Sequence, residues 1–373
     1  MKSILYVMHI SWGFIKQRPH FIAEELSHEY DVDVMHRYQH IHKSQLVTKQ
    51  ESVKGKMSFI KYDIIPFDKI PILRWFNTEF INRSLIRSRI TDINKYDIVW
   101  FTSPYSYWFF KDIIPNDVDV YYDCMDDMSE FPELSQRRKA LMIKAEQSLL
   151  NRVSHVFFSS DYLKDRIIKK YHYTGRYSVV NNALELPSQN YRPSQYIKDK
   201  LSFVEQLSNP IIYIGVIASW FDFESVMSAL DAIPSINVVL IGPHSQEIPD
   251  HPRLHVIGTV PRESIFSFMQ MAVALMMPFK ITELVKSVNP VKLYEYIYSG
   301  KPVIASRYSE TERFLPYISL YKDSKEFVSI INDIVLLKRP CLNKGDIEAF
   351  VNSNTWQSRG VRINAVLRSE MID

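Results

Sequence analysis

The sequence predicts two α/β domains, each built from a parallel β-sheet that is covered by helices. The chain has 373 residues, which is more than the roughly 100–150 residues of one ordinary core and suits two domains. Short apolar runs alternate with helical patterns, and this alternation favours parallel sheets. Hydrophobic residues make up 46% of the chain and charged residues 23%, so the composition of a disordered protein is excluded.

The first predicted domain covers residues 1–187 and opens with a strand, a loop and a helix. The apolar run Ser3–His9 precedes a polar loop, and Pro19 then occupies the first turn of a helix. The same reasoning predicts helices at Leu134–Leu150 and Asp161–Tyr171, and strands at Val32–Met35, Asp97–Thr102, Val118–Asp123, Val153–Ser159 and Tyr177–Val180.

The second predicted domain covers residues 208–355 and comes after a linker at residues 188–207, which is mostly polar. Residues 356–373 are expected to form a C-terminal helix that packs back on the first domain. Three of the strands expected in the second domain end on glycine. The expected strands are Ile211–Gly215, Val238–Gly242, Leu254–Gly258, Ala272–Pro278 and Pro302–Ser306.

Basic residues are concentrated between positions 36 and 91, where 11 Lys/Arg face four Asp/Glu among aromatic and apolar residues. This mixture suits peripheral contact with an anionic membrane, in which Arg83, Arg87 and Arg89 are the expected contact residues. A solvated basic surface is an equally weighted alternative. Nucleic acid is not an expected partner, because the rest of the chain is charge-balanced and no nucleic-acid-binding module is recognised.

The cysteine content and the first residues predict a cytoplasmic protein. Cys124 and Cys341 are the two cysteines, and neither belongs to a zinc or disulfide pattern. The segment Met1–His9 is too short and too soon polar for a signal peptide. No stretch approaches the ~20 apolar residues of a membrane span, so we expect a cytoplasmic location, with contact at the inner membrane face at most.

The segment Ser287–Ser306 contains the strongest chemical signal. Asn289 is a favoured N-cap, Pro290 a favoured first helical residue and Gly300 a favoured C-terminal residue with positive φ. The amides at the start of the helix between them attract an anion such as a diphosphate, and Lys292 adds a positive charge. Glu295 lies one turn further on the same face and can accept both hydroxyls of a ribose. A capped surface helix with an internal Lys–Glu pair is the alternative.

Four segments together resemble GT-B glycosyltransferases. Asn289-Pro-Val-Lys-Leu-Tyr-Glu-Tyr with Ser-Gly-Lys-Pro-Val-Ile-Ala is similar to their nucleotide-sugar motif. The bacterial teichuronic-acid-type (group 1) enzymes are resembled by Trp12-Gly-Phe-Ile-Lys-Gln-Arg-Pro-His20, by Tyr122-Asp-Cys-Met-Asp-Asp127 and by Tyr213-Ile-Gly-Val-Ile-Ala-Ser-Trp-Phe-Asp222. Two features depart from many relatives: Ser287 stands where retaining enzymes carry a glutamate, and residues 217–222 lack a basic pair.

The resemblance implies two Rossmann-like, doubly wound domains that face a central cleft, with the acceptor on the first and the donor on the second. It assigns the donor ribose to Glu295, and the diphosphate to Lys292 and the helix start at Asn289 and Pro290. Gly215 would let the backbone approach the donor. The acceptor side of the cleft would be lined by Trp12, Lys16, Gln17, Arg18 and His20.

Three carboxylates lie at or just beyond the end of a predicted strand of the first domain and are candidates for the general base. Asp126 is the preferred one, because Asp123 belongs to the strand and Asp127 can cap the next turn; Asp127 is the second choice. The alternative for each is a role as a loop or capping residue.

The expected function is transfer of a hexosyl group from a UDP- or GDP-sugar to a hydroxyl of a bacterial surface polysaccharide or lipid-linked saccharide. No cofactor and no metal are expected, since Asp31-Val-Asp33 and Asp117-Val-Asp119 lie at strand starts rather than in loops. Two alternatives remain. One is a catalytically silent GT-B subunit that binds nucleotide or serves as a scaffold, and the other is a GT-B epimerase that acts on a UDP-sugar.

Overall fold

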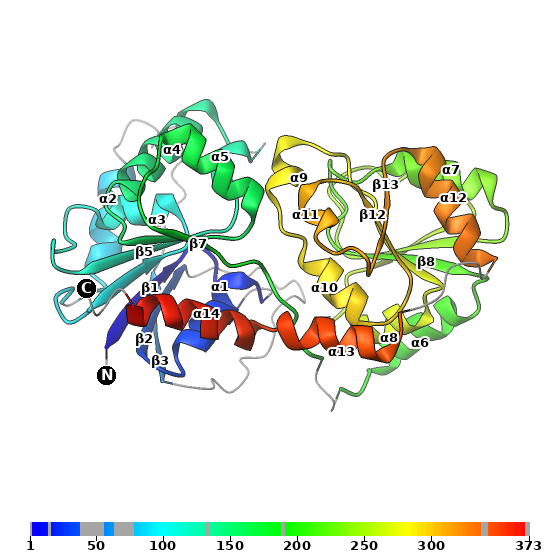
Figure 1. The fold of residues 1–373 in the computed structure, drawn as a ribbon, viewed down its shortest axis with the longest axis horizontal. Helices are drawn as coiled ribbons and strands as arrows, with labels where there is room; N and C mark the ends of the chain where they lie inside the picture. Colours follow the sequence, from blue (N-terminus) through cyan, green and yellow to red (C-terminus); the bar gives the residue numbers. More distant parts are fainter. Residues whose placement is uncertain are drawn as a thin grey trace. The chain divides into compact units, whose positions relative to one another are not determined.

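The computed structural model describes residues 2–13, 16–37, 56–62, 78–90, 92–131, 134–187, 191–336 and 342–369 (Figure 1). The chain forms two compact units. The first unit contains Met1–Asn181 and Arg359–Asp373, and the second contains Asn182–Ser358. Cys341 lies outside the described residues, and Cys124 is a free, buried thiol.

The first unit is built on a seven-stranded parallel sheet in the order β3-β2-β1-β4-β5-β6-β7. β1, β4, β5 and β6 lie in its interior and are almost wholly buried, as expected for strands covered on both faces. The strands are β1 (Ser3–Met8), β2 (Asp31–Arg37), β3 (Met57–Tyr62), β4 (Ile98–Phe101), β5 (Asp119–Cys124), β6 (His155–Phe158) and β7 (Tyr177–Val179).

Helices connect these strands, and three of them start at a serine whose side chain accepts a hydrogen bond from the first turn. Ser103, Ser135 and Ser160 are these N-caps. The elements are α1 (Arg18–Leu26), α2 (Thr78–Arg87), α3 (Pro104–Phe110), η3 (Met128–Glu130), α4 (Gln136–Leu150) and α5 (Asp161–Tyr171).

The second unit is built on a six-stranded parallel sheet in the order β10-β9-β8-β11-β12-β13. Alternate residues of the same strand face two different cores, as the pleat requires. On β8, Ile212 and Ile214 pack against α6, α8 and α10, whereas Ile211 and Tyr213 pack against α7 and α12. Figure 1 labels these helices around the second sheet. The strands are β8 (Pro210–Ile214), β9 (Asn237–Ile241), β10 (Leu254–Gly258), β11 (Ala274–Met277), β12 (Val303–Ser306) and β13 (Ser319–Tyr321).

Helices alternate with these strands. They are α6 (Gln195–Glu205), α7 (Phe223–Ala232), η4 (Arg262–Ser264), α8 (Ile265–Met271), α9 (Glu283–Ser287), α10 (Val291–Tyr298), α11 (Ser309–Glu312), α12 (Ser324–Val335) and α13 (Lys344–Ser353).

The predicted linker at residues 188–207 is wrong for much of its length, because α6 occupies Gln195–Glu205. The polar sequence hid this helix. It is capped by Ser194 and buries Ile197 and Val204 against the second core, while most of its other side chains stay in contact with solvent. The chain passes from the first unit to the second at Asn181–Asn182, before the predicted boundary.

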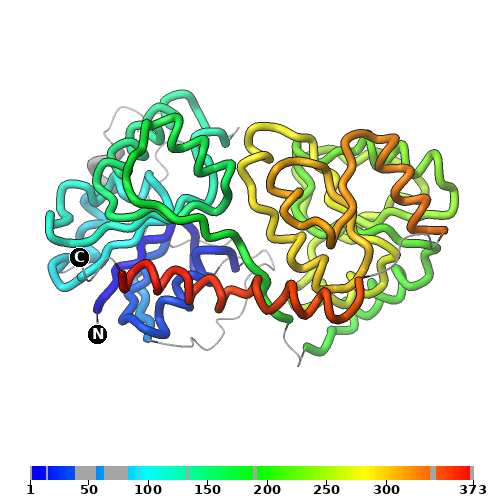
Figure 2. Tube along the Cα trace, viewed as in Figure 1, coloured from blue at the N-terminus to red at the C-terminus, as the bar shows by residue number. Residues whose placement is uncertain are grey.

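The C-terminal helix α14 (Trp356–Ser369) belongs to the first unit from Arg359 onward (Figure 2). A Cβ added at Gly360 would come within 2.7 Å of the Glu25 side chain of α1. Glycine therefore allows the close approach of α14 to α1. Arg359 also donates a hydrogen bond to the carbonyl of Asn181 at 3.1 Å.

Each sheet reverses its strand order once, between β1 and β4 in the first unit and between β8 and β11 in the second. In doubly wound sheets ligands bind beyond the carboxyl ends of the strands at such points. The loops that follow β1, β4, β8 and β11 therefore mark where a ligand site is expected in each unit.

Candidate functional site

In the second unit, α10 belongs to the connection between the parallel strands β11 and β12. The helix in such a connection runs back along the sheet, so the amino end of α10 lies at the edge where the strands have their carboxyl ends. The helix starts one residue later than predicted, with Pro290 rather than Asn289 at the N-cap. Gly300 has φ +75°, as predicted for the end of the helix, and donates a hydrogen bond to the carbonyl of Ile297 at 3.0 Å.

Glu295 is wholly buried and is held by two cations. Lys292 Nζ lies 2.8 Å from Glu295 Oε2, and Arg262 Nη2 lies 2.9 Å from Glu295 Oε1. Burial alone would raise the pKa of this carboxyl, but Lys292 and Arg262 outweigh burial and keep the pKa below its ordinary value. Glu295 is therefore an ionised carboxylate, and its two oxygens retain lone pairs for a further donor such as a ribose hydroxyl.

Arg262 was missed by the sequence reasoning. It lies in η4, beyond the end of β10, and bridges two carboxylates: its Nε is 2.7 Å from Glu185 Oε2 while its Nη2 binds Glu295. One sequence feature could have pointed to Arg262: it follows Gly258, the glycine that ends a predicted strand, by four residues. Its link to Glu295 joins positions 33 residues apart and depends on the tertiary fold.

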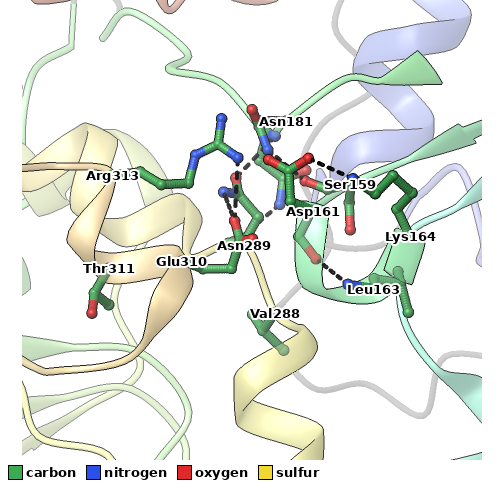
Figure 3. A network of polar contacts seen from close by, with 12 residues as sticks. Ser159, Asp161, Leu163, Lys164, Asn181, Val288, Asn289, Glu310, Thr311 and Arg313 are labelled. Carbon is green, nitrogen blue, oxygen red and sulfur yellow. Dashed lines mark hydrogen bonds and ion pairs between the residues drawn. The ribbon is translucent and has the colours of Figure 1, made fainter. Parts of the chain in front are cut away.

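Asn289 serves to hold the start of α10 in place. Its Oδ1 accepts hydrogen bonds from the Asn182 amide at 3.0 Å and the Tyr294 hydroxyl at 3.1 Å. Its Nδ2 donates to Glu310 Oε2 at 3.1 Å (Figure 3). The Asn289 side chain is buried, and both its oxygen and its nitrogen already have hydrogen-bond partners within the protein. These contacts favour a supporting role for Asn289 and leave Lys292, whose side chain is 28% exposed, as the cation available to a diphosphate.

Gly215 lies directly after β8, and the structure brings it to the same edge as α10. The preceding residue, Ile214, is bonded to α10, since the Ile214 amide donates to the Tyr296 hydroxyl at 2.8 Å. The adjacent strand β9 is followed by Gly242, which has φ +142° and where a Cβ would lie 2.0 Å from the Gly215 carbonyl oxygen. Glycine at position 242 is thus required for the backbones to approach here.

In the first unit, the three candidate carboxylates at the end of β5 have different surroundings. Asp123 is the penultimate residue of β5 and is fully buried against Arg18. Asp127 is the N-cap of η3 and binds Arg166 at 2.6 Å and Lys170 at 3.4 Å. Asp126 lies between them and is partly exposed, and its carboxylate receives no hydrogen bond or ion pair from any residue in the described part of the chain.

The Asp126 carboxyl has a pKa raised to about 7. Burial is the main cause; Arg18 opposes it, while the charges of Asp123 and Asp127 add to it. A carboxylate with a pKa near neutrality is suited to taking a proton from a hydroxyl at physiological pH. The two premises for choosing Asp126, that Asp123 belongs to the strand and that Asp127 caps the next turn, are both met.

Asp126→Asn is expected to stabilise the protein at neutral pH. The folded carboxyl binds its proton up to about pH 7, whereas an unfolded aspartate releases it near pH ~3.9. The folded state thus binds more protons in this interval, and wild-type stability falls as pH rises through it. The gain in melting temperature of the variant should grow from about pH 4 to about pH 7 and then stay constant. Thermal denaturation at several pH values measures it, and a pH-independent difference would contradict the raised pKa.

Arg18 was expected to contact a ligand, but the structure places it in the interior, where it is 4% exposed. Its Nε lies 2.9 and 3.0 Å from the two carboxylate oxygens of Asp123, and its Nη1 donates to the Val180 carbonyl at 2.6 Å. We expected the planar guanidinium of Arg18 to bind an anionic ligand, but it binds the carboxylate of Asp123 within the protein instead. Arg18 therefore fixes α1 and the end of β7 to the end of β5.

Arg18→Lys is expected to destabilise the first unit by about 1–3 kcal/mol, because one ammonium cannot serve both Asp123 and the buried Val180 carbonyl. For a protein of this size the melting temperature should drop by a few degrees, and chemical denaturation measures the free energy. Lys16→Gln is the matched control, since Lys16 pairs at the surface with Glu24 at 2.9 Å and should lose under about 1 kcal/mol. Equal effects of the two changes would contradict the structural role.

Of the other residues expected at the acceptor side, Gln17 and His20 have structural roles, whereas Trp12 is partly exposed. Gln17 and His20 form the capping box of α1, and His20 is buried with Nε2 3.2 Å from the Ser11 carbonyl. Burial lowers the pKa of His20 to about 4, so it is neutral and structural. Trp12 is partly exposed and contacts the rings of His20 and Phe59 at 5.0 and 4.9 Å between centroids.

A second histidine, His9, had not been singled out from the sequence. It comes directly after β1, and its Nδ1 lies 2.8 Å from the hydroxyl of Thr102, which comes directly after β4. The pair therefore marks the point at which the first sheet reverses its order. Burial, aided by the nearby His20, lowers the pKa of His9 to about 4, and the ring is uncharged at neutral pH.

Two of the three expected membrane residues have partners inside the first unit. Arg83 binds Asp112 at 2.7 Å and the Trp108 carbonyl at 3.0 Å, and Arg87 donates to the Phe109 carbonyl at 2.9 Å. These contacts fasten α2 to α3. Arg89 is exposed. The rest of the basic segment lies largely outside the described residues, and no helix within the described ranges is long and apolar enough to cross a bilayer.

Comparison with solved structures identifies the fold. Sucrose-phosphate synthase from Thermosynechococcus elongatus superposes on the whole chain with a TM-score of 0.72 at 14% identity, and 100% of each chain is covered. The chain has the GT-B fold. HepE from Anabaena, solved with UDP-glucose, gives a TM-score of 0.63 at 13% identity over 99% of this chain and 100% of that one. The lipopolysaccharide outer core galactosyltransferase WaaB gives 0.59 at 13% identity over 99% of each chain.

Comparison with curated sequences points to the group indicated by the motifs. The candidate teichuronic acid biosynthesis glycosyltransferase TuaH of Bacillus subtilis (strain 168) is 25% identical over 227 residues. The aligned region spans 57% of this chain and 56% of TuaH, little more than half of that relative. No protein-family model matches the chain. The predicted GT-B fold and the resemblance to teichuronic-acid-type glycosyltransferases are confirmed.

Proposed function

We propose that the protein is a glycosyltransferase that moves a hexosyl group from a nucleotide diphosphate-sugar to a hydroxyl of a bacterial surface polysaccharide or lipid-linked saccharide. The observation that carries the proposal is the buried, ionised Glu295 beside the accessible Lys292 at the start of α10. A carboxylate and an ammonium one turn apart match the ribose and the diphosphate of one donor.

The relatives support the two substrate classes. HepE is solved with UDP and with UDP-glucose, which favours a UDP-sugar, and GDP-sugars are the other candidate. TuaH is named for teichuronic acid biosynthesis and WaaB for the outer core of lipopolysaccharide. Both names concern surface polysaccharides, and this favours an acceptor of that kind.

The proposed mechanism depends on positioning and electrostatics. Asp126 takes the proton of the acceptor hydroxyl as that oxygen attacks the anomeric carbon of the donor. Lys292 and the amides at the start of α10 stabilise the charge that develops on the departing nucleotide diphosphate. Glu295 fixes the ribose, so the anomeric carbon is presented in one orientation. We propose that this chemistry needs neither a bound metal nor a cofactor.

Mass spectrometry of products tests the proposal. The full chain is offered a panel of UDP- and GDP-sugars together with lipid-linked saccharides extracted from bacteria. We expect one donor to give a product heavier by one sugar residue, with release of the nucleotide diphosphate. A sugar isomer formed from donor alone would instead indicate an epimerase, and nucleotide binding without any product would indicate a scaffold subunit.

We also propose peripheral contact with anionic membrane through the basic segment of residues 36–91, whose local charge balance supports it. Arg89→Gln should lower binding to anionic vesicles about fivefold, since one basic residue near such a surface contributes ~1 kcal/mol. Arg83→Gln is the matched control: its charge is used by Asp112, so vesicle binding should change less. Sedimentation with anionic and neutral vesicles at low and high salt measures both. Equal binding to the two vesicle types would leave the segment as a solvated surface.

A further inference from the structure

Four charged side chains of the second unit form one chain of alternating sign: Glu185, Arg262, Glu295 and Lys292. The successive distances are 2.7, 2.9 and 2.8 Å. Glu295 is the member that is completely buried, whereas Lys292, Glu185 and Arg262 are 28%, 26% and 23% exposed. The set is neutral before any ligand arrives.

The two cations that hold Glu295 are attached to it in different ways. Arg262 is fixed from both sides, with Nε on Glu185 and Nη2 on Glu295, and its planar fork leaves little freedom. Lys292 reaches Glu295 with a single ammonium on a flexible stem from the first turn of α10. A diphosphate at the helix start would therefore draw Lys292 away while Arg262 stays in place.

The departure of Lys292 would leave a buried carboxylate with one cation. A carboxylate that has lost its partners in a dry site takes up a proton, and a protonated carboxyl can no longer accept hydrogen bonds with both oxygens. Within the described residues, the charged or titratable groups that face Glu295 are Lys292 from its own helix, Arg262 from η4 with Glu185 behind it, and the Tyr296 hydroxyl.

We infer that Arg262 is a positioning residue: it keeps Glu295 in place and charged to receive the donor ribose when Lys292 turns to the diphosphate. The inference rests on the proposed function, because it takes the ligand to be a ribonucleoside diphosphate. It adds a division of labour between two cations that both pair with Glu295, in which Lys292 binds the ligand and Arg262 maintains the carboxylate that accepts the ribose.

The experiment is a calorimetric titration of the full chain with UDP and with GDP from pH 5.5 to pH 8. The ratio of variant to wild-type Kd is compared at each pH, because the ratio cancels the ionisation of the nucleotide itself. Arg262→Gln should weaken binding about tenfold at pH 8 and by less at pH 5.5, because Glu295 of the variant takes up a proton when Lys292 turns to the diphosphate, and proton uptake on binding favours the complex as pH falls. Arg262→Lys restores the charge and should give a ratio that is raised but independent of pH.

Two matched variants separate the roles. Lys292→Met should weaken binding by a factor that stays constant with pH, because Arg262 still keeps Glu295 ionised. Arg253→Gln changes another arginine of the second unit, whose guanidinium donates only to the carbonyls of Ile233, Ile236 and Leu230 among the described residues. Its ratio should stay near one, so loss of a structural arginine alone does not reproduce the effect.

A constant ratio for Arg262→Gln across the pH range would overturn the inference, and so would a pH-dependent ratio for Lys292→Met alone. Failure of the proposed function looks different: wild type would then bind neither UDP nor GDP at any pH, and the inference would fall with it. Melting curves of each variant exclude unfolding as the cause, and Arg262→Lys provides the test if Arg262→Gln does not fold.

Discussion

Asp126→Asn is expected to lower the rate of sugar transfer by about 10²–10⁴-fold while the affinity for the donor changes little. The amide has the shape of the carboxyl but cannot take a proton. Neighbouring carboxylates cannot replace it, because Asp123 is bound by Arg18 and Asp127 by Arg166 and Lys170. Initial rates with the donor found by the product screen, together with donor Kd, measure the effect.

Asp127→Asn is the matched control for this prediction. It removes a carboxylate next to Asp126 that caps η3 and pairs with Arg166. We expect it to lower the melting temperature and to leave turnover within about tenfold of wild type, since it holds structure rather than a proton. Turnover near the wild-type level in Asp126→Asn would refute the assignment of the base, and loss of donor binding would refute the separation of roles.

The central strands of both sheets could be predicted from sequence because they are buried on both faces. β1, β4, β8 and β9 are mostly apolar runs, β5 is such a run interrupted by Asp123, and each was predicted to within about one residue at either end. Of the four edge strands, β7 and β10 were predicted and β3 and β13 were not, since Met57–Tyr62 is mostly half-exposed and Ser319–Tyr321 is very short. A strand with so few buried apolar residues gives a weak signal in its own sequence.

Helices were predicted well where capping and apolar spacing agree. The helix α5 has the predicted bounds Asp161–Tyr171, with Ser160 as its cap. The helix α6 was taken for a linker, because prolines and polar residues surround only a narrow buried stripe. The average composition of a segment does not reveal such a helix, because a surface helix can be held in place by a few apolar residues on one face.

The candidate site was predicted in part, and the limit has a physical reason. Local spacing was enough to pair Lys292 with Glu295, because residues three apart on a helix are neighbours. Long-range ion pairs have no local signal: Arg18 binds Asp123 across 105 positions, and Arg262 binds Glu295 across 33. Arg18 was therefore taken for a ligand contact and Arg262 was missed.

Glu295→Ala is expected to weaken binding of the nucleoside diphosphate by at least tenfold. Each hydrogen bond from a ribose hydroxyl to the charged carboxylate contributes about 1.5–3 kcal/mol, and two are lost together. The change also frees Lys292 and Arg262, whose charges attract the diphosphate and offset part of the loss. Calorimetry with UDP and GDP measures the net effect, and melting curves verify that the second unit stays folded.

The 2′-deoxy nucleotides separate the ribose contact from the attraction of the freed cations. Wild type should bind 2′-deoxy-UDP or 2′-deoxy-GDP more weakly than the ribonucleotide, because one hydroxyl that Glu295 accepts is missing. Glu295→Ala should bind the two forms equally, since the acceptor is gone, and should bind inorganic pyrophosphate at least as tightly as wild type does. If Glu295→Ala still preferred the ribonucleotide as strongly as wild type, the ribose would be held elsewhere, and Glu295 would be only the partner that keeps Lys292 and Arg262 in place.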